Sequence, residues 1–119
     1  MAWLWRLRHT REKAVRTFTT ALHLMRQYPE YCFLHSSPQL YKYLQQDEPV
    51  LYERIKERIA GCQWEVAGGT WIEPDVNLPD GESLVRQFLL GQQFLRREFG
   101  QESRLLWLPD TFGFSAALP

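Results

Sequence analysis

The sequence predicts an α/β fold in which short buried strands alternate with longer helices. Two observations carry this prediction: long segments repeat apolar residues at three- and four-residue spacing, and short apolar runs come after them. Prolines and glycines separate these segments. Buried strands that alternate with helices imply parallel pairing and right-handed crossovers.

The first helix is expected from Thr10, a possible N-cap, to about Tyr28, where Pro29 stops it. Residues 31–34 then form a short aromatic and apolar run, which predicts the first strand. The buried face of this helix is predicted from its apolar spacing to contain Ala14, Val15, Phe18, Ala21, Leu22 and Met25.

A second helix is expected to begin at Ser37 and Pro38, because proline suits the first helical position. Pro49 breaks or restarts it, and Gly61 ends it. Residues 64–67 predict the second strand. The inner faces are predicted to contain Leu40, Tyr41 and Leu44, and after the break Leu51, Ile55 and Ile59.

The next helix is expected to be capped by Asp80 or Gly81 and to end before Gly100. A third strand is predicted over residues 104–108, running into Pro109 and Asp110. The inner face of the helix is predicted to contain Leu84, Phe88, Leu95 and Phe99.

Composition argues against several classes of partner. Fourteen basic residues balance fourteen acidic ones, so neither nucleic acid nor an anionic membrane is expected to bind. No apolar run approaches the roughly 20 residues that cross a bilayer. The first eight residues lack a signal-peptide pattern. Cys32 and Cys62 are expected to be buried free thiols, and the location is predicted to be cytoplasmic.

Both ends of the chain suggest truncation. Residues 1–5 lead directly into a helix, so an N-terminal strand is expected before them. Residues 115–119 stop where another helix is expected to start.

Parallel sheets carry their chemistry at the carboxyl ends of the strands. These positions are His35–Ser37, residues 68–75 with Glu73 and Asp75, and the segment of Asp110, Phe112 and Gly113. A carboxylate followed by an aromatic ring and a glycine suits a sugar site. From spacing alone, an acid after a strand is more often a helix cap or a turn residue, and both roles stay open for Asp110.

Three blocks of sequence carry a family resemblance. Residues 107–115 resemble the W-x-x-D-x-F-G-x-S segment of glycoside hydrolase family 38 α-mannosidases. Residues 68–87 are similar to the preceding block in the cytosolic and bacterial branch, and residues 2–5 resemble the segment directly after the family's H-x-D zinc motif. The resemblance implies that residues 1–119 are part of the N-terminal catalytic domain. It also implies an incomplete parallel β/α barrel of the seven-stranded type, of which about three strand–helix units are expected here.

The resemblance also implies roles for individual residues. The aspartate that matches Asp110 is the nucleophile and a zinc ligand in a retaining α-mannosidase that acts on non-reducing α-mannosyl residues of glycans. Trp3 matches a ring that lines the sugar pocket and Phe112 one that packs on the mannose, although core packing is the alternative for both. Glu73 and Asp75 are expected to support the site.

The remaining zinc ligands and the acid/base aspartate of the family lie outside these residues, so the chain alone is expected to be inactive. None of the three histidines is expected to be a ligand: His23 falls within the first helix, His9 lies just before it near solvent, and His35 follows a strand but matches no zinc ligand of the family. Two alternatives stay open: another metal-dependent carbohydrate enzyme such as a polysaccharide deacetylase, or a non-catalytic carbohydrate-binding remnant that uses Trp3, Trp71 and Phe112. The full-length protein could also form a homo-oligomer.

Overall fold

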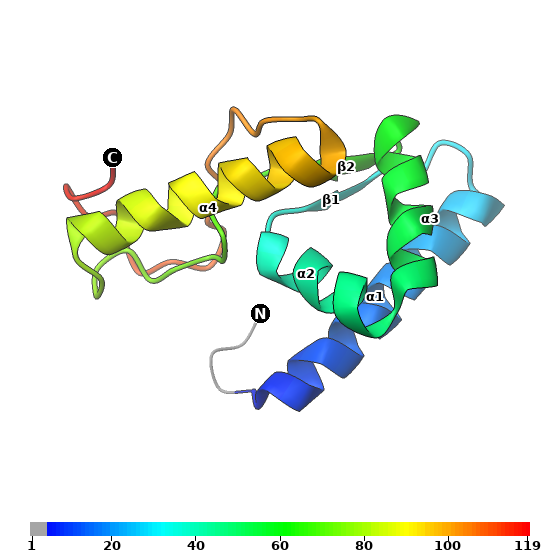
Figure 1. Ribbon diagram of the computed structural model, residues 1–119, viewed down its shortest axis with the longest axis horizontal. Helices are drawn as coiled ribbons and strands as arrows, with labels where there is room; N and C mark the ends of the chain where they lie inside the picture. The colour runs from blue at the N-terminus through cyan, green and yellow to red at the C-terminus, as the bar shows by residue number, and fades with distance from the viewer. Residues whose placement is uncertain (1–4) are drawn as a thin grey trace. The chain divides into compact units, whose positions relative to one another are not determined.

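The computed structural model describes residues 5–119, which divide into two compact units. Trp3 lies outside the described residues. Unit 1 contains described residues 5–34 and 39–65, and unit 2 contains residues 35–38 and 66–119. Figure 1 shows the elements in chain order, which are α1 (Leu7–Gln27), β1 (Phe33–His35), α2 (Pro38–Asp47), α3 (Pro49–Ala60), β2 (Trp64–Val66) and α4 (Gly81–Phe99).

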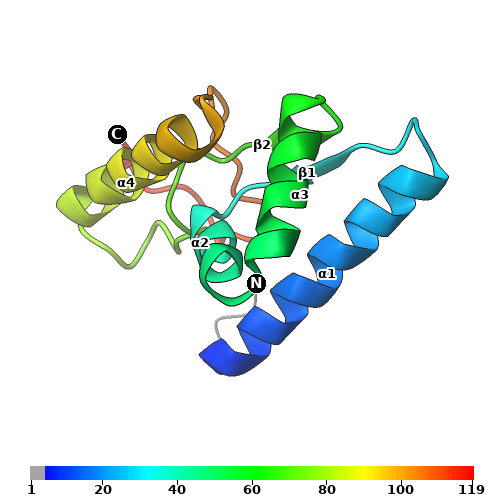
Figure 2. The same ribbon diagram turned by 45° about the vertical axis from the view of Figure 1, so that its right-hand side comes forward.

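Helix α1 begins at Leu7, three residues before the predicted cap Thr10. The N-cap is Arg6, which makes no side-chain cap, and its carbonyl accepts hydrogen bonds from the backbone N–H groups of His9 and Thr10. A polar cap is dispensable at an exposed helix start, because water can satisfy the first N–H groups. The buried face is the predicted one except for the half-buried Val15. In Figure 2, α1 runs beside α3, its neighbour in unit 1.

Four aromatic rings from α1, β1, α2 and β2 form the centre of unit 1. The rings of Phe18 and Trp64 meet edge to face with centroids 5.2 Å apart, and those of Phe33 and Trp64 are 4.6 Å apart. The buried indole of Trp64 donates to the hydroxyl of Tyr41 at 2.8 Å. Burial raises the pKa of Tyr41 above its ordinary value, so this hydroxyl stays neutral and accepts the bond.

Helices α2 and α3 begin at Pro38 and Pro49, as predicted. At the end of α2, Asp47 accepts two hydrogen bonds from the guanidinium of Arg11 on α1, at 2.6 and 2.7 Å. The same guanidinium lies 4.2 Å from the ring centroid of Tyr43. These contacts hold α1 against α2 through a planar, two-pronged interaction.

Strands β1 and β2 pair in parallel, as predicted. The N–H of Phe33 donates to the carbonyl of Gln63, and further along both strands the N–H of Ala67 donates to the carbonyl of His35. In the parallel pattern these bonds place Phe33 opposite Trp64, so that both rings face the same side.

The predicted third strand is wrong. The sheet in the described residues has two strands, and residues 104–108 have no regular secondary structure. Their side chains do alternate: Leu106 and Leu108 pack on a cluster with Val76 and Leu84, while Leu105 and Trp107 are exposed. Alternation shows that one face of the segment is buried. A β-strand also needs a neighbouring strand that hydrogen-bonds to its backbone N–H and C=O groups.

The expectation of buried cysteines is also wrong, because Cys32 and Cys62 are both exposed. Cys32 lies just before β1 and is exposed, whereas its neighbour Phe33 is half-buried. Cys62 lies in the turn after α3 with a positive φ of 59°. Neither position gives the thiol a buried face.

Helix α4 of unit 2 has both predicted ends. The Asp80 carboxylate accepts from the N–H of Ser83 at 2.7 Å, and this bond lowers the pKa of Asp80. Gly100 ends the helix in the left-handed conformation. The buried face includes Gly91 and Phe94, which the spacing had not predicted, and the predicted Phe88 and Phe99 are half-buried. No helix among residues 5–119 is long and apolar enough to span a lipid bilayer.

Candidate functional site

The loop after β2 is buried where it leaves the strand. Gly68 has a φ of +87°, and a Cβ atom there would lie 2.8 Å from the Cβ of Ser36 and 2.9 Å from its carbonyl oxygen. Both the backbone conformation and this close approach require glycine. The Gly68 backbone is therefore in contact with the residue directly after β1.

Ser36 and Glu73 join the ends of the two strands. Ser36 is 3% exposed, and its hydroxyl donates a very short hydrogen bond to Oε1 of Glu73. A buried hydroxyl that loses its acceptor costs about 1–3 kcal/mol. The predicted supporting residue Glu73 is thus held at the carboxyl end of β1. Ser36 was one of the predicted strand-end positions, but nothing in the neighbouring sequence indicated that it would bind Glu73.

Helix α4 holds the same loop from its other side. The N–H of Trp71 donates to the Gln87 carbonyl at 2.8 Å, and the N–H of Ile72 donates to the Gln87 side chain at 3.0 Å. A Cβ atom at Gly91 would lie 2.4 Å from the carbonyl oxygen of Gly69. The loop and the helix therefore touch through their backbones.

Asp75 and Asn77 form a turn further along this loop. Oδ1 of Asp75 accepts from the N–H of Asn77 at 3.0 Å. Nδ2 of Asn77 in turn donates to the carbonyl of Gly113 at 3.4 Å. This carbonyl also accepts from the hydroxyl of Thr111 at 2.9 Å. The structure therefore links the predicted supporting residue Asp75 to the segment that carries Asp110.

Gln92 of α4 fixes the start of the final segment. Its side chain donates to the Ser103 carbonyl at 2.6 Å and accepts from the Ser103 N–H at 3.0 Å. Beyond Ser103, Leu106 and Leu108 pack on the apolar cluster that contains Val76 and Leu84. These contacts bring the chain from the end of α4 to Pro109 and Asp110.

Asp110 itself is exposed and makes no hydrogen bond or ion pair with the other residues of 5–119. Aromatic side chains flank it along the chain: Trp107 is 44% exposed and Phe112 is 76% exposed. Phe112 is therefore not part of the core of unit 2. A carboxylate with exposed rings beside it can approach a ligand that has both polar groups and an apolar face.

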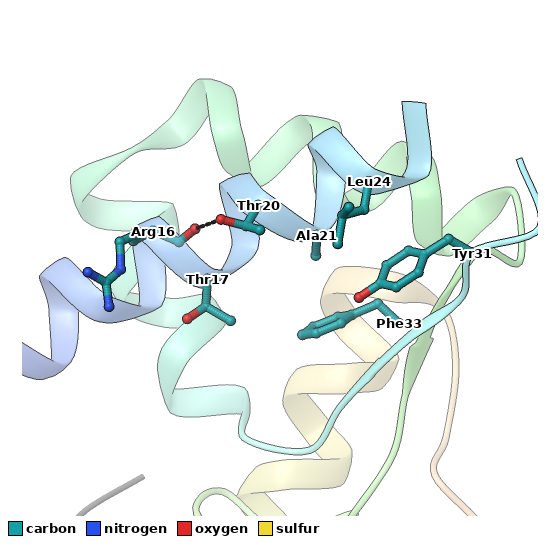
Figure 3. A pocket seen from close by; sticks show the side chains of 7 residues that line it. All are labelled: Arg16, Thr17, Thr20, Ala21, Leu24, Tyr31 and Phe33. Atoms are coloured by element: carbon teal, nitrogen blue, oxygen red, sulfur yellow. Dashed lines mark hydrogen bonds between the residues drawn. The ribbon is translucent and has the colours of Figure 1, made fainter. Parts of the chain in front are cut away.

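Unit 1 has a separate groove of about 250 Å³ (Figure 3). In the figure the Thr20 hydroxyl donates to the Arg16 carbonyl, and the rings of Tyr31 and Phe33 face α1. The lining contains no carboxylate and so supplies neither an acid nor a carboxylate nucleophile. It consists of Arg16, Thr17, Thr20, Ala21, Leu24, Tyr31 and Phe33.

Comparison with known proteins decides the family. The sequence model described as Glycosyl hydrolases family 38 N-terminal domain matches residues 1–119. The chain belongs to glycosyl hydrolase family 38. Relatives include Alpha-mannosidase G of Dictyostelium discoideum, 48% identical over 100% of this chain, and Alpha-mannosidase of Saccharomyces cerevisiae, 44% identical over 99%. Alpha-mannosidase 2C1 of Homo sapiens is 48% identical over 99% of this chain. The chain spans 11% of the length of each of these relatives.

The described residues of this family 38 chain do not form a complete zinc site. Among residues 5–119, no three His, Cys, Asp or Glu side chains are grouped so that they could hold an ion. His9 and His23 are on α1, where their ring nitrogens contact the side chains of Arg8 and Arg26. Asp110 offers one exposed carboxylate donor, which fits one position of a metal site and no more.

His35, the last residue of β1, differs from the exposed histidines of this family 38 chain. Its Nε2 atom is buried, and burial lowers the pKa of His35 from its ordinary 6.5 to about 3. Below pH 6.5 the unfolded chain binds a proton at His35 more readily than the folded chain does. The folded state is therefore favoured above pH 6.5, and this contribution is lost as the pH falls toward 3. We expect the free energy of unfolding to fall in this window by up to about 1.4 kcal/mol per pH unit.

Urea unfolding at several pH values between 7 and 4 checks this expectation. His35→Gln removes the titrating group and should flatten the dependence, whereas the exposed control His23→Gln should keep it. Equal slopes in the wild type and His35→Gln would show that His35 does not titrate in this way.

Proposed function

We propose that the complete protein that contains these residues is a retaining, zinc-dependent α-mannosidase. It hydrolyses non-reducing α-mannosyl residues of glycans. Membership of family 38 and the alpha-mannosidase names of the relatives support the activity. The structural observation that carries the proposal is the exposed Asp110 carboxylate with exposed aromatic rings on either side. A cytoplasmic location belongs to the proposal and rests on the resemblance of residues 68–87 to the cytosolic branch.

Asp110 is the nucleophile in this proposal. One of its carboxylate oxygens attacks the anomeric carbon of the mannosyl residue and forms a C–O bond, while the bond to the leaving oxygen breaks. An acid outside this chain protonates the leaving oxygen. The same outside group, now a base, takes a proton from water, and the water oxygen displaces the Asp110 carboxylate from the anomeric carbon. Two displacements at the same carbon retain its configuration.

Other residues have supporting roles in the proposal. Asp110 also supplies one oxygen ligand to the zinc ion, and the other ligands come from outside the described residues. When bound, zinc would keep the carboxylate ionised and polarise sugar hydroxyls. Phe112 and Trp3 provide rings against the sugar. Glu73, through Ser36, and Asp75, through Asn77, hold the loop between β2 and α4.

We further propose that the domain is an incomplete parallel β/α barrel of the seven-stranded type. The parallel β1–β2 pair supports this, as does the position of the buried Ser36 and the Gly68–Gly69 loop directly after the strands. The carboxyl ends of such strands are where these folds place their sites.

The test uses the protein encoded by the complete reading frame that contains these residues, hereafter the complete protein. Purified with zinc, it should hydrolyse an aryl α-mannoside but not the matching β-mannoside. Proton NMR of the first product should show the α-anomer before it equilibrates, as retention requires. The 119-residue chain alone should be inactive, because the family resemblance places the acid outside it.

Other results assign the protein elsewhere. Release of the β-anomer first would exclude the retaining mechanism. Deacetylation of an acetylated polysaccharide without mannoside hydrolysis would favour a deacetylase. Sugar binding without turnover would favour a carbohydrate-binding protein.

A further inference from the structure

Asn77 contacts the Asp110 segment through a bond that neither its position in the sequence nor the family resemblance suggested. The residue lies in the loop between β2 and α4, 33 positions before Asp110. Its Nδ2 atom donates to the carbonyl of Gly113. At 3.4 Å the bond is at the long end for an N–H···O contact, so its effect depends on how firmly the turn that carries Asn77 is held.

The turn around Asn77 is fixed on both sides. Before it, Asp75 accepts the Asn77 N–H at 3.0 Å, a local bond that sets the turn. Between these residues, Val76 is fully buried. Val76 packs with Leu84 of α4 and with Leu108. The Asn77 side chain therefore extends from a backbone that cannot shift without disturbing the core of unit 2.

Residues 76 and 77 consequently hold the Asp110 segment at two points. Val76 packs with Leu108, two residues before Asp110, and Asn77 holds Gly113, three residues after it. Residues 109–115 contain no helix or strand, so no regular backbone bonds fix their path. Side-chain bonds to the backbone must provide that restraint.

Gly113 makes the restraint necessary. Its φ of +116° lies in a region that glycine enters without steric cost, so the chain can also leave it easily. Its carbonyl accepts from two donors, Asn77 and the Thr111 hydroxyl. The Thr111 bond is local and can move with the segment. Asn77 belongs to another loop, so its bond ties the segment to the core of unit 2.

We propose that Asn77 is a positioning residue for Asp110. It holds the Gly113 carbonyl and thereby the direction in which the Asp110 carboxylate meets the substrate. This inference rests on the proposed role of Asp110 as the nucleophile. Small displacements of a reacting group can cost about a hundredfold in rate, even when the substituted residue does not touch the substrate.

The test compares Asn77→Asp, Asn77→Ala and the control Leu78→Ala in the complete protein. Asn77→Asp keeps the size of the side chain but replaces the donor by an acceptor. Leu78 is 83% exposed and lies in the same turn, so its truncation controls for general disturbance of the loop. The readouts are kcat and KM on an aryl α-mannoside, and hydrogen–deuterium exchange of the peptide that covers residues 107–118 without substrate.

Both Asn77 variants should lower kcat by about tenfold to a hundredfold with KM changed less than about threefold. Their 107–118 peptide should exchange severalfold faster, and Leu78→Ala should match the wild type in both readouts. Asn77 variants that match Leu78→Ala would overturn the inference and leave the proposed function intact. A wild type inert on α-mannosides would overturn the proposed function and the catalytic role of Asn77 together. The exchange data would then still show whether Asn77 holds the segment.

Discussion

Asp110→Ala is expected to lower kcat on an α-mannoside by at least about a thousandfold in the complete protein. The substitution removes the oxygen that forms the covalent bond to the anomeric carbon. Among residues 5–119, no hydrogen bond or ion pair binds the Asp110 carboxylate, so the fold should tolerate its loss. Steady-state kinetics with an aryl α-mannoside measure the effect.

Two further measurements distinguish the lost nucleophile from other causes. Glu53→Ala removes an exposed carboxylate from α3 of unit 1 and should keep the wild-type rate. Zinc content, determined for Asp110→Ala and Asp110→Asn, shows how much of the loss comes from a missing ligand. Azide should restore part of the rate in Asp110→Ala and form a mannosyl azide of inverted configuration, since a small anion fits where the carboxylate was. An Asp110→Ala protein with more than about a tenth of the wild-type kcat would exclude the nucleophile role.

Gly91→Ala is expected to lower the free energy of unfolding by about 3 kcal/mol or more. Helix propensity predicts the opposite sign, because alanine in a helix interior is favoured over glycine by about 1 kcal/mol. The clash outweighs this gain: the new Cβ would lie 2.4 Å from the Gly69 carbonyl oxygen and 2.6 Å from the Thr70 carbonyl carbon. These are backbone atoms and cannot swing aside. A lowered midpoint of thermal unfolding and a reduced soluble yield measure the effect.

Gly81→Ala provides the matched control on the same helix. A Cβ atom at position 81 would lie 3.9 Å from the Ala117 carbonyl oxygen, which is an ordinary van der Waals contact. This variant should therefore unfold within about 1 kcal/mol of the wild type. A Gly91→Ala protein as stable as Gly81→Ala would mean that α4 and the loop do not touch through their backbones.

The helices could be predicted because their ends are specified locally. Pro38, Pro49 and the Asp80 cap act on backbone groups within one turn, and all three mark helix starts in the structure. The parallel pairing of β1 and β2 was also predictable from the alternation of strands and helices. The absence of a third strand could not be predicted from the local sequence. Residues 104–108 have the pattern of a strand, but strand formation depends on a neighbour that the pattern does not contain.

The strand-end rule selected Glu73, Asp75, Asp110 and Phe112 only as positions, with a cap or turn role still open for Asp110. Specific roles for Asp110 and Phe112 came from the resemblance of residues 107–115 to family 38, and these roles stay predictions. Ser36 and Asn77 act across 37 and 36 positions of sequence, on Glu73 and Gly113 respectively. Nothing in their local spacing distinguishes them from ordinary turn residues. Gly91 likewise has no local signal for its close approach to the Gly69 carbonyl.

The paired bonds between Gln92 and Ser103 bear on which amino acids position 92 can accept. A carboxamide presents a donor and an acceptor in one plane, as a peptide group does, so Gln92 offers Ser103 what a neighbouring strand residue would offer. Glutamate has the same length but no donor, and methionine has neither group at that distance. Position 92 therefore discriminates by the chemistry of the side chain and not by its volume. The Gln92 side chain thus makes the pair of hydrogen bonds that a backbone peptide group of an adjacent strand would otherwise make.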